Sequence, residues 1–395
     1  MRTRRQEVTL SPSTPLSLYV HVPFCASRCG YCDFNTYTAT ELGNDVTRDT
    51  FHEHLITEIH QAAQRLADNH RVDTVFFGGG TPTLLGSRAL KDILSAIGEN
   101  FDVAPDAEVT TEANPDSVDP AMLEDLKQGG FTRISFGMQS SAPRVLATLE
   151  RTHTPGASSA AAKAARAAGF EHVNLDLIYG TPGETDDDLN RSLDEVLDAG
   201  VDHVSAYSLI VESGTALARR VQRGEIPMPD DDVAADRYEL IDDRLASAGF
   251  DWYEVSNWAK PGSECRHNIA YWRNAAWWGI GPGAHSHLDG RRWWNVKHPH
   301  TYAQRVSAGL SPMQDEEVLT PEQRALENLM LGLRMKAGVA LDAVPTNDDA
   351  ITDTIATLTD QGLIDPAVLE HEPSMLALTR RGRLMADHVV RTLAV

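Results

Sequence analysis

The sequence predicts an α/β fold with a partial barrel of six strand–helix units and a small additional domain at the C-terminal end. Short apolar segments alternate with helical patterns over the first two thirds of the chain. Polar side chains or glycines follow most of the strand-like segments, and the composition changes near residues 251 and 316. Strand–helix alternation of this kind implies a parallel sheet with right-handed crossovers.

Six segments are predicted as strands because each is short, apolar and bounded by Gly, Pro or polar residues. They are 17–22, 73–77, 107–113, 132–136, 172–178 and 203–209. Helical patterns, with apolar residues three and four positions apart, lie between them, for example at 51–62, 90–97 and 157–168. Six units are too few for a closed eight-stranded barrel, which leaves an open doubly wound sheet or a partial barrel.

Polar groups near the carboxyl ends of these segments favour the partial barrel, because barrel-like sheets build their sites at that face. Glycines 78–80 follow the second segment and Gln139 follows the fourth. Tyr207 lies near the end of the sixth. Loops are often polar, but Glu112 and Asp176 lie inside otherwise apolar strands, where a lone carboxylate is costly to bury. We interpret these two carboxylates as functional.

The remainder of the chain divides into two parts. Residues 251–315 are rich in Trp, His, Gly and Asn, whereas residues 316–395 return to a mixed composition. The latter part predicts helices at 322–335 and 350–360, a hairpin from 362–364 to 375–378, and a last helix opening at 379–382. This order is typical of a winged-helix-like domain. It has no strong basic stripe, so we expect a structural or docking role. The predicted divisions are therefore 1–250, 251–315 and 316–395.

Composition narrows the classes of function. The chain has 395 residues, 42% of them hydrophobic, and a formal charge of −22. It can therefore bury a sizeable core, and binding to nucleic acid is not expected because phosphate backbones repel such a charge. The basic residues at positions 1–5 are followed by no apolar run, which predicts a cytoplasmic protein without a secretory signal.

Three of the four cysteines form a CxxxCxxC pattern at Cys25, Cys29 and Cys32. In a reducing compartment, clustered cysteines indicate metal binding or catalysis. Thiolates are the usual ligands of iron–sulfur clusters, and three of them leave one iron of a [4Fe–4S] cubane open. A zinc site completed by Cys265 or His21, or a set of free thiols, remains an alternative on spacing alone.

The residues around the cysteines resemble the radical SAM superfamily, and more closely its branch that contains oxygen-independent coproporphyrinogen III oxidase. The resemblance runs to the end of the chain. Its blocks are residues 19–25, 30–32, 78–83 (GGGTPT), 112–115 (EANP), 133–140 (RISFGMQS) and 174–180 (NLDLIYG). It implies a partial (β/α)6 radical SAM barrel, with a [4Fe–4S] cluster on Cys25, Cys29 and Cys32 and S-adenosylmethionine (SAM) at the open iron.

The same resemblance implies a set of residues that contact SAM. They are Tyr19, Gly79, Glu112, Gln139, Arg151 and Asp176. Three further residues lie close by and would contact SAM or a second nucleotide. They are Tyr31, Gly80 and Thr81.

Two features distinguish members of this branch. The oxidases have a fourth cysteine, CxxxCxxCxC, where this chain has Phe34, and they have more than the 24 residues that precede Cys25 here. Both differences count against oxidase activity. The pattern HNxxYW at residues 267–272 instead resembles the signature of the haem chaperones of the branch. This likeness implies that His267 binds haem iron, or lies directly against it, with residues 251–315 covering the haem.

Chemistry is compatible with that role, because imidazole is a good axial ligand for haem iron. The rings of Tyr271 and Trp272 could face a porphyrin, Asn268 could orient the imidazole, and Cys265 is a rival ligand. The alternative interpretation is that His267 and Asn268 only hold a loop and that the aromatic rings pack in the core.

Three hypotheses about function follow. The first is a haem chaperone, not an enzyme, that binds haem and a SAM-ligated [4Fe–4S] cluster. It would deliver haem to an acceptor haemoprotein, and that acceptor could lie at a membrane surface. The second is a radical SAM enzyme of porphyrin metabolism that acts on a tetrapyrrole, as in anaerobic oxidative decarboxylation of coproporphyrinogen III. The third is a zinc-binding interaction scaffold.

Overall fold

A computed structural model describes residues 15–42, 46–66, 70–344 and 349–394 of the chain. The basic residues 1–5, on which the prediction about secretion depends, lie outside this part. Among the described residues, no helix combines the length and the apolar character that crossing a membrane requires.

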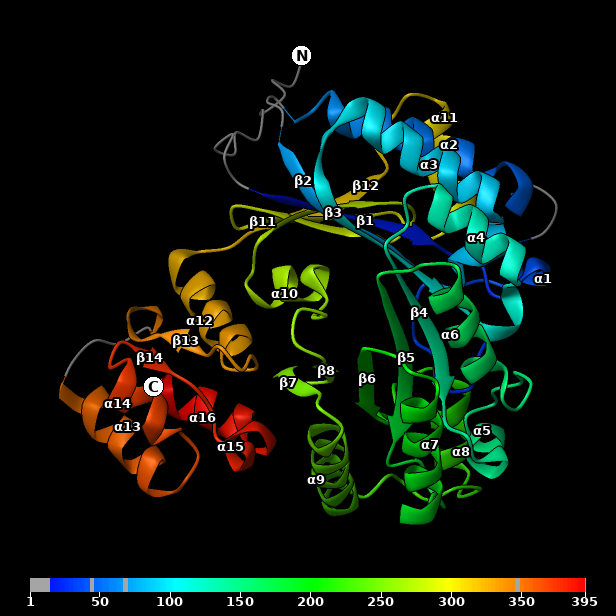
Figure 1. The fold of residues 1–395 in the computed structure, drawn as a ribbon. Helices are drawn as coiled ribbons and strands as arrows, with labels where there is room; N and C mark the ends of the chain where they lie inside the picture. Colours follow the sequence, from blue (N-terminus) through cyan, green and yellow to red (C-terminus); the bar gives the residue numbers. More distant parts are fainter. Residues whose placement is uncertain (1–14, 43–45, 67–69, 345–348, 395) are drawn as a thin grey trace.

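Six parallel strands form the middle of the molecule (Figure 1), and each overlaps one of the six segments predicted from the sequence. They are β1 (Leu16–Val22), β2 (Arg71–Gly79), β3 (Asp102–Ala113), β4 (Arg133–Gln139), β5 (His172–Tyr179) and β6 (His203–Ser208). Neighbouring strands pair in sequence order, so all six carboxyl ends lie at one edge of the sheet. The predicted α/β fold with six strand–helix units is therefore confirmed.

Helices lie between these strands, and α8 and α9 follow the last of the six (Figure 1). They are α1 (Ala39–Leu42), α2 (Arg48–Ala63), α3 (Ser87–Asn100), α4 (Pro120–Gln128), α5 (Pro143–Thr148), α6 (Ala157–Ala167), α7 (Asp186–Asp198), α8 (Ala216–Gln222) and α9 (Asp231–Ser247). The apolar residues that predicted α2 and α3 form the faces that these helices bury in the main core. Burial of such a stripe is the main source of stability for a surface helix.

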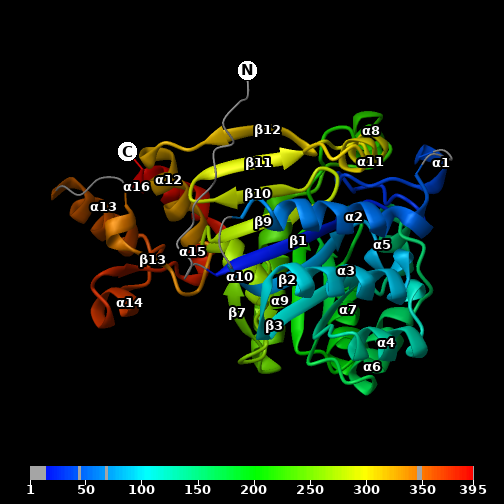
Figure 2. The same cartoon turned by 90° about the horizontal axis from the view of Figure 1, so that it is seen from above.

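The sheet extends beyond the six predicted strands at both edges. The added strands are β7 (Asp251–Glu254), β8 (Asn257–Ala259), β9 (Ala276–Ile280), β10 (His285–Leu288), β11 (Arg291–Asn295) and β12 (Met313–Val318). In the described part, one mixed sheet results, in the order β12-β11-β10-β9-β1-β2-β3-β4-β5-β6-β8-β7. Figure 2 shows β9 to β12 running beside β1. The aromatic-rich part thus continues the barrel sheet, which its composition did not predict.

A buried ion pair holds helix α10 (Arg266–Trp272) against the sheet. Arg133 Nε lies 3.0 Å from Glu108 Oε2, and the two side chains are 2% and 5% exposed. The carboxylate of Glu108 also accepts hydrogen bonds from the backbone N–H groups of Arg266 (3.2 Å) and His267 (3.1 Å). Arg133 donates a further bond to the carbonyl of Ser263 (2.8 Å). The pair therefore fixes the segment that carries the HNxxYW pattern.

The C-terminal part has a hydrophobic core of its own. Its elements are α12 (Pro321–Gly332), β13 (Val339–Ala340), α13 (Asp349–Asp360), α14 (Pro366–His371), β14 (Met375–Leu376), α15 (Arg380–Leu384) and α16 (Ala386–Leu393). The predicted helices are confirmed, but the last one is divided in two. The predicted hairpin is reduced to one bridge between Ile364 and Leu378, and β14 pairs with β13 instead. The returning strand thus has a partner that lies earlier in the chain than the predicted one.

Arginines fix the C-terminal domain to the barrel (Figure 1). Arg380 donates to Asp243 of α9 (2.6 Å), and the guanidinium of Arg383 lies 3.7 Å from the ring centre of Trp252 in β7. On the other side of the domain, Glu327 of α12 pairs with Arg292 of β11 at 2.7 Å. These basic side chains contact groups of the protein itself, and the docking role of the domain stays a prediction.

Replacement of Arg133 by Met should destabilise the protein by about 3–5 kcal/mol, because the substitution leaves the buried carboxylate of Glu108 without a counter-charge. The measurement is urea unfolding followed by circular dichroism. Arg71→Met is the matched control, since Arg71 pairs with Asp73 at the surface and should cost less than about 1 kcal/mol. Equal effects of the two substitutions would contradict the role given to the buried pair.

Candidate functional site

The carboxyl ends of β1 to β5 and the loops that follow them enclose a cavity of about 150 Å³. All the residues predicted to bind the cluster or SAM line this cavity, except Tyr19. His267, which was predicted to bind haem, does not line it. The lining residues from the prediction are Cys25, Cys29, Tyr31, Cys32, Gly79, Gly80, Thr81, Glu112, Gln139, Arg151 and Asp176. Residues up to 151 positions apart in sequence thus meet because parallel strands end at the same edge of the sheet.

The cysteine loop is held at both ends by backbone hydrogen bonds. Cys25 donates to the carbonyl of Tyr37 (3.0 Å), and Gly30 donates to that of Leu149 (3.1 Å). All three predicted ligands are partly exposed free thiols, whereas Cys265 is buried away from the cavity. The loop therefore presents three sulfurs to one space without Cys265.

The surroundings of the thiols favour binding of a positively charged group. Burial raises the pKa of Cys25 to about 11 and also raises that of Cys32. Arg151 Nη1 lies 3.2 Å from Cys29 Sγ. Thiolates need such positive charge nearby, and iron supplies more of it. Within the described residues, no three His, Cys, Asp or Glu side chains are arranged around a single ion. The donor set and its surroundings fit a multi-iron cluster with thiolate ligands.

Gly79 and Gly80 allow the loop after β2 to approach the cysteine loop. Gly79 has φ +110°, and a Cβ there would lie 2.6 Å from the ring of His21. A Cβ on Gly80 would lie 2.3 Å from the carbonyl oxygen of Phe24 and 3.1 Å from Cys25 Sγ. Glycine lets a backbone segment approach a ligand closely, because it has no side chain. The structure adds a second reason, which is the close approach of two backbone segments.

Glu112 and Asp176 face the same cavity. Glu112 Oε2 accepts a hydrogen bond from the backbone N–H of Gly79 (3.1 Å). Asp176 accepts from the Ser135 hydroxyl (3.1 Å) and from Asn174 Nδ2 (2.7 Å). Burial, and then the charge of Asp176, raise the pKa of Glu112 to about 8, and burial raises the pKa of Asp176. Two such carboxylates form a site for a cationic ligand.

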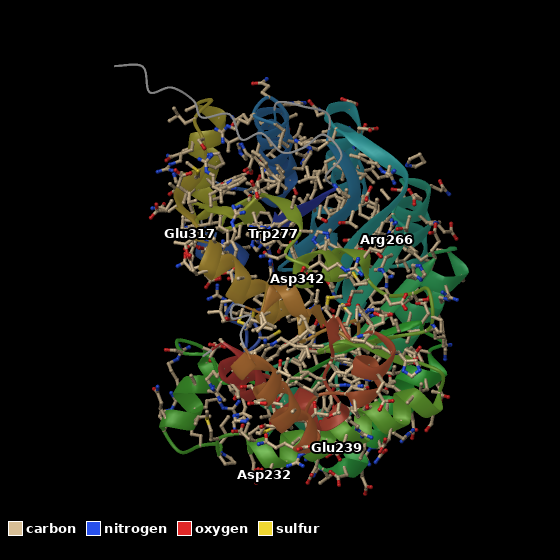
Figure 3. The ribbon with its side chains drawn as sticks, turned by 90° about the vertical axis from the view of Figure 1, so that its left-hand side faces the viewer. Asp232, Glu239, Arg266, Trp277, Glu317 and Asp342 are labelled. Atoms are coloured by element: carbon tan, nitrogen blue, oxygen red, sulfur yellow. The ribbon has the colours of Figure 1, made fainter. Side chains whose placement is uncertain are left out.

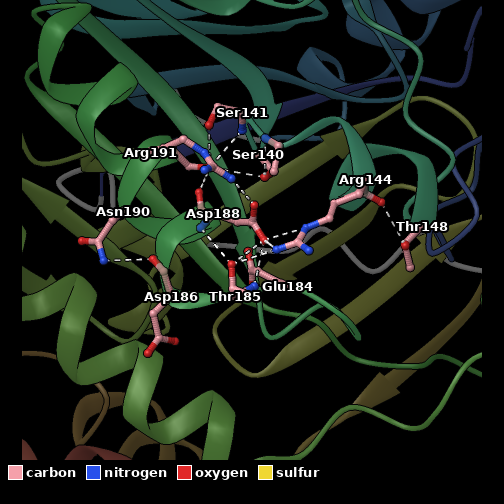
Figure 4. Close-up of polar contacts among 12 residues, drawn as sticks. Ser140, Ser141, Arg144, Thr148, Glu184, Thr185, Asp186, Asp188, Asn190 and Arg191 are labelled. Atoms are coloured by element: carbon pink, nitrogen blue, oxygen red, sulfur yellow. Dashed lines mark hydrogen bonds and ion pairs between the residues drawn. The ribbon is translucent and has the colours of Figure 1, made fainter.

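Helix α7 braces the segment that follows Gln139, the last residue of β4 (Figure 4). The hydroxyl of Ser192 accepts a bond from the backbone N–H of Ser141 (2.9 Å), and Arg144 Nε donates to Asp188 (2.8 Å). Gln139 itself has φ +66°, which is unusual for a residue with a Cβ. Strain of this kind persists only where the surroundings enforce it. The contacts with α7 hold the backbone directly after Gln139, whose side chain lines the cavity.

Tyr19 lies on the other side of Gly79 and Glu112, in a second cavity of about 660 Å³. Its hydroxyl is 3.0 Å from His21 Nδ1. A third cavity, of about 430 Å³, occupies the inside of the barrel. Phe34 and Glu112 line all three spaces. The side chain of Phe34 is 63% exposed, so an apolar ring stands where the three cavities meet.

His267 is buried and packs as a structural residue in the described conformation. Its side chain is 1% exposed, and its ring stacks on Phe76 and meets Tyr271 edge to face. Nδ1 lies 2.8 Å from the hydroxyl of Thr74, which therefore orients the ring in place of Asn268. Nε2 is buried and makes no hydrogen bond within the described residues. Cys265, the rival ligand, is also buried and donates to Glu108.

Three polar residues that support the site were missed by sequence reasoning. Ser135 and Asn174 hold Asp176, and Thr74 holds His267. Each lies inside a predicted strand and is buried. Buried polar side chains need partners, so a hydroxyl or amide at a core position of a strand was the available signal.

Comparison with known sequences identifies the family. The radical SAM superfamily matches residues 19–196, and the HemN C-terminal domain matches residues 319–385. A protein of Mycobacterium tuberculosis named heme chaperone HemW is 54% identical over 97% of this chain and 95% of its own length. The chain belongs to the HemW family. Within that family, the heme chaperone HemW of Bacillus subtilis is 33% identical over 94% of this chain and 97% of its own length.

A solved structure shows the same fold. Coproporphyrinogen III oxidase (HemN) of Escherichia coli superposes with a TM-score of 0.83 over 98% of this chain and 92% of its own, at 24% identity. This similarity establishes the fold and confirms the predicted radical SAM architecture with a small C-terminal domain. The resemblance inferred from the motifs is likewise confirmed.

Replacement of Glu112 by Gln should change how stability depends on pH. The pKa of Glu112 is raised from 4.5 to about 8, so its contribution to stability is fully present below pH 4.5 and is lost as the pH rises through about 8. We expect the melting temperature of the cluster-free variant to match that of the parent near pH 5 and to exceed it by a few degrees at pH 9. The measurement is thermal unfolding between pH 5 and 9.

Glu316→Gln is the control for that series, because Glu316 forms an exposed pair with Arg291. Its melting curve should follow that of the parent or fall slightly below it at every pH. If the melting temperature of Glu112→Gln also equals that of the parent up to pH 9, ionisation of Glu112 does not destabilise the folded protein.

Proposed function

We propose that this protein is a haem chaperone that binds haem and carries a [4Fe–4S] cluster with SAM at its open iron. The observation that carries the proposal is the similarity, over nearly the full length, to relatives named heme chaperone HemW. The site supports it, because thiols, glycines and paired carboxylates of the expected kinds meet in one cavity. The acceptor would be a haemoprotein in the cytoplasm or at a membrane surface.

The chain's own residues have distinct tasks in this proposal. Cys25, Cys29 and Cys32 would hold the cluster, and the Arg151 guanidinium would balance thiolate charge. Glu112 and Asp176 would receive the cationic groups of SAM, with Tyr19, Tyr31, Gly79, Gly80, Thr81 and Gln139 completing the surroundings. When bound, the cluster and SAM would supply one-electron chemistry. Iron binding to the thiols displaces their protons, which burial otherwise retains.

We propose that the C-terminal domain docks on the barrel and covers one side of it. Its arginines bind α9 and β7, and α12 lies against β11. Residues 1–250 would form the cofactor-binding barrel, residues 251–315 the haem-covering part and residues 316–395 the docking domain. The proposed division follows function, since β7 to β12 share the sheet of the barrel.

A second candidate function is radical SAM catalysis on a tetrapyrrole. One observation favours it, which is that the lumen of the barrel opens beside the cluster cavity and shares Glu112, Gln139 and Asp176 with it. A substrate in the lumen would therefore lie near SAM. Phe34 in the place of the fourth cysteine of the oxidases still weighs against that particular reaction.

Loss of one cysteine should abolish the cluster. Cys29→Ser removes a thiolate that the cavity needs, and we expect no broad absorbance near 400 nm after anaerobic reconstitution with iron and sulfide. Cys265→Ser is the matched control and should retain the parent's iron and sulfide content, because Cys265 lies outside the cavity. Stoichiometric zinc without iron in the anaerobically purified parent would favour the scaffold hypothesis instead.

The experiment that tests the function uses one reconstituted sample for two assays. Haem titration followed by absorbance should show saturable binding at one site. Incubation with coproporphyrinogen III, SAM and a reductant should give no protoporphyrinogen IX. Repeated turnover in the second assay would establish the enzyme, and a parent chain that takes up no haem would refute the chaperone.

A further inference from the structure

We propose that haem binds in the 660 Å³ cavity between the extended edge of the sheet and helix α12, with the imidazole of His285 on the iron and the ammonium group of Lys297 against a propionate. The proposal rests on the proposed function and deepens it, because it names the site and the ligand. It differs from the sequence-based expectation, in which His267 binds the iron.

The cavity has the size and the walls of a ligand site. Its volume of about 660 Å³ lies within the range of roughly 300–1,000 Å³ that ligand pockets occupy. One wall comes from Tyr271 and from Trp277 of β9, whose rings meet edge to face at 5.0 Å. Met330 and Leu331 of α12 also line the cavity. Aromatic and aliphatic lining residues suit a flat macrocycle that buries a large apolar area.

The figures show how these walls come from distant parts of the chain. Strands β9 to β11 run side by side next to β1, and α12 of the C-terminal domain lies near one end of these strands (Figure 2). In Figure 3 the C-terminal domain faces the viewer, and Trp277 and Glu317 are labelled above Asp342. The site is thus incomplete without the C-terminal domain, which supplies Met330 and Leu331.

His285 has ring nitrogens that are free to bind iron. It is an exposed residue of β10, and within the described residues neither nitrogen has a hydrogen bond or an ion pair. Its ring stacks on Trp294, the residue opposite it on β11, with centroids 5.6 Å apart. Stacking fixes the plane of the imidazole while it leaves the edge with the nitrogens open. Imidazole in this state is a suitable axial ligand.

The other histidines of this region are already engaged. His21 bonds Tyr19 through Nδ1 and the carbonyl of Asn35 through Nε2. His287 bonds the carbonyl of Ala275 through Nδ1, and its Nε2 accepts from the backbone N–H of Gly290. His267 is buried and bonded to Thr74. His285 is therefore the histidine that can reach a ligand in the cavity without a change in the fold.

Lys297 supplies a cation that has no partner. Its side chain makes no hydrogen bond or ion pair with any described residue, although it lines the cavity. Arg292, the neighbouring cation, already binds Glu317 (2.9 Å) and Glu327 (2.7 Å). The carboxylate of a haem propionate would pair with the ammonium group of Lys297, and the remaining propionate would face solvent. Charge thus orients the macrocycle with its propionate edge toward Lys297.

The cavity also adjoins the cluster site. Gly79, Glu112 and Phe34 line both spaces, and Tyr19 lies on the side of the haem cavity. Haem in this cavity would therefore lie next to the residues proposed to bind SAM. The two ligands would meet across one thin wall of side chains.

The test is haem titration of the anaerobically reconstituted full chain, with His285→Ala, His267→Ala and His388→Ala compared with the parent. His388 is an exposed histidine of α16 and serves as the control. We expect His285→Ala to raise the Kd at least tenfold and to change the Soret band, with partial recovery on adding free imidazole. His388→Ala should match the parent, and His267→Ala should keep the parent's haem spectrum if it folds, as judged by its circular dichroism.

Two further variants examine the walls and the charge. Met330→Arg places a cation in the apolar wall from an exposed position and should weaken binding without loss of the cluster. Lys297→Gln should weaken binding of haem severalfold but leave binding of haem dimethyl ester unchanged, because the ester has no carboxylate for Lys297. This pair of probes identifies the propionate contact.

The outcomes separate the inference from the function on which it rests. No haem binding by the parent would refute the proposed function. Binding by the parent together with an unchanged Kd and spectrum in His285→Ala would overturn the inference and leave the function standing. Loss of the iron ligand's spectral signature in a folded His267→Ala, but not in His285→Ala, would likewise overturn it in favour of the HNxxYW histidine.

Discussion

The parallel pairing of β1 to β6 is the constraint on which the rest of the structure depends. Each strand pairs with the next in sequence order, so their carboxyl ends share one edge of the sheet. The cysteine loop after β1, the glycines after β2, and the carboxylates of β3 and β5 therefore meet in one cavity. The cost is electrostatic, since burial raises the pKa of both carboxyl groups and the charge of Asp176 raises that of Glu112 further. Arg151 and Arg28 line the same cavity, Arg151 lowers the pKa of Asp176, and a cationic ligand would complete the balance.

Much of the barrel could be predicted because each of its six strands contains a short run of mostly apolar residues. A strand buried on both faces reads as a short apolar run, and all six such runs became strands. Strands β7 to β12 could not be predicted in this way. They are short, with three to six residues each against twelve in β3, and β12 carries the acidic side chains of Asp315, Glu316 and Glu317. Their pairing is fixed by β1 and β6, which lie far away in sequence, and no local pattern encodes such partners.

Residue type and spacing predicted which side chains line the cavity after β1 to β5, but they did not predict how the histidines are bonded. Three cysteines on one loop cannot lie far apart, so their spacing alone brings the sulfurs together. His267 belongs to a recognisable pattern, but its ring is turned inward by Thr74 and by the backbone contacts of α10 with Glu108. Thr74 lies 193 residues earlier, and a threonine inside a strand gives no sign of its partner. His285 belongs to no pattern, and its availability follows only from the contacts that its neighbours make.

Phe34 lies between the cavity that contains the cysteines and the cavity that contains His285. Phe34 is 63% exposed and lines three cavities. They are the 150 Å³ cavity with the three cysteines, the 430 Å³ cavity inside the barrel and the 660 Å³ cavity beside Tyr19. Exposed apolar surface next to a cavity is unfavourable unless a ligand covers it. A thiol at this position would offer a polar, reactive group to the lumen, whereas phenylalanine offers an apolar edge to a flat ligand on either side. In the proposed function, phenylalanine at this junction would therefore favour holding an apolar macrocycle beside the cluster over reacting with one inside the barrel.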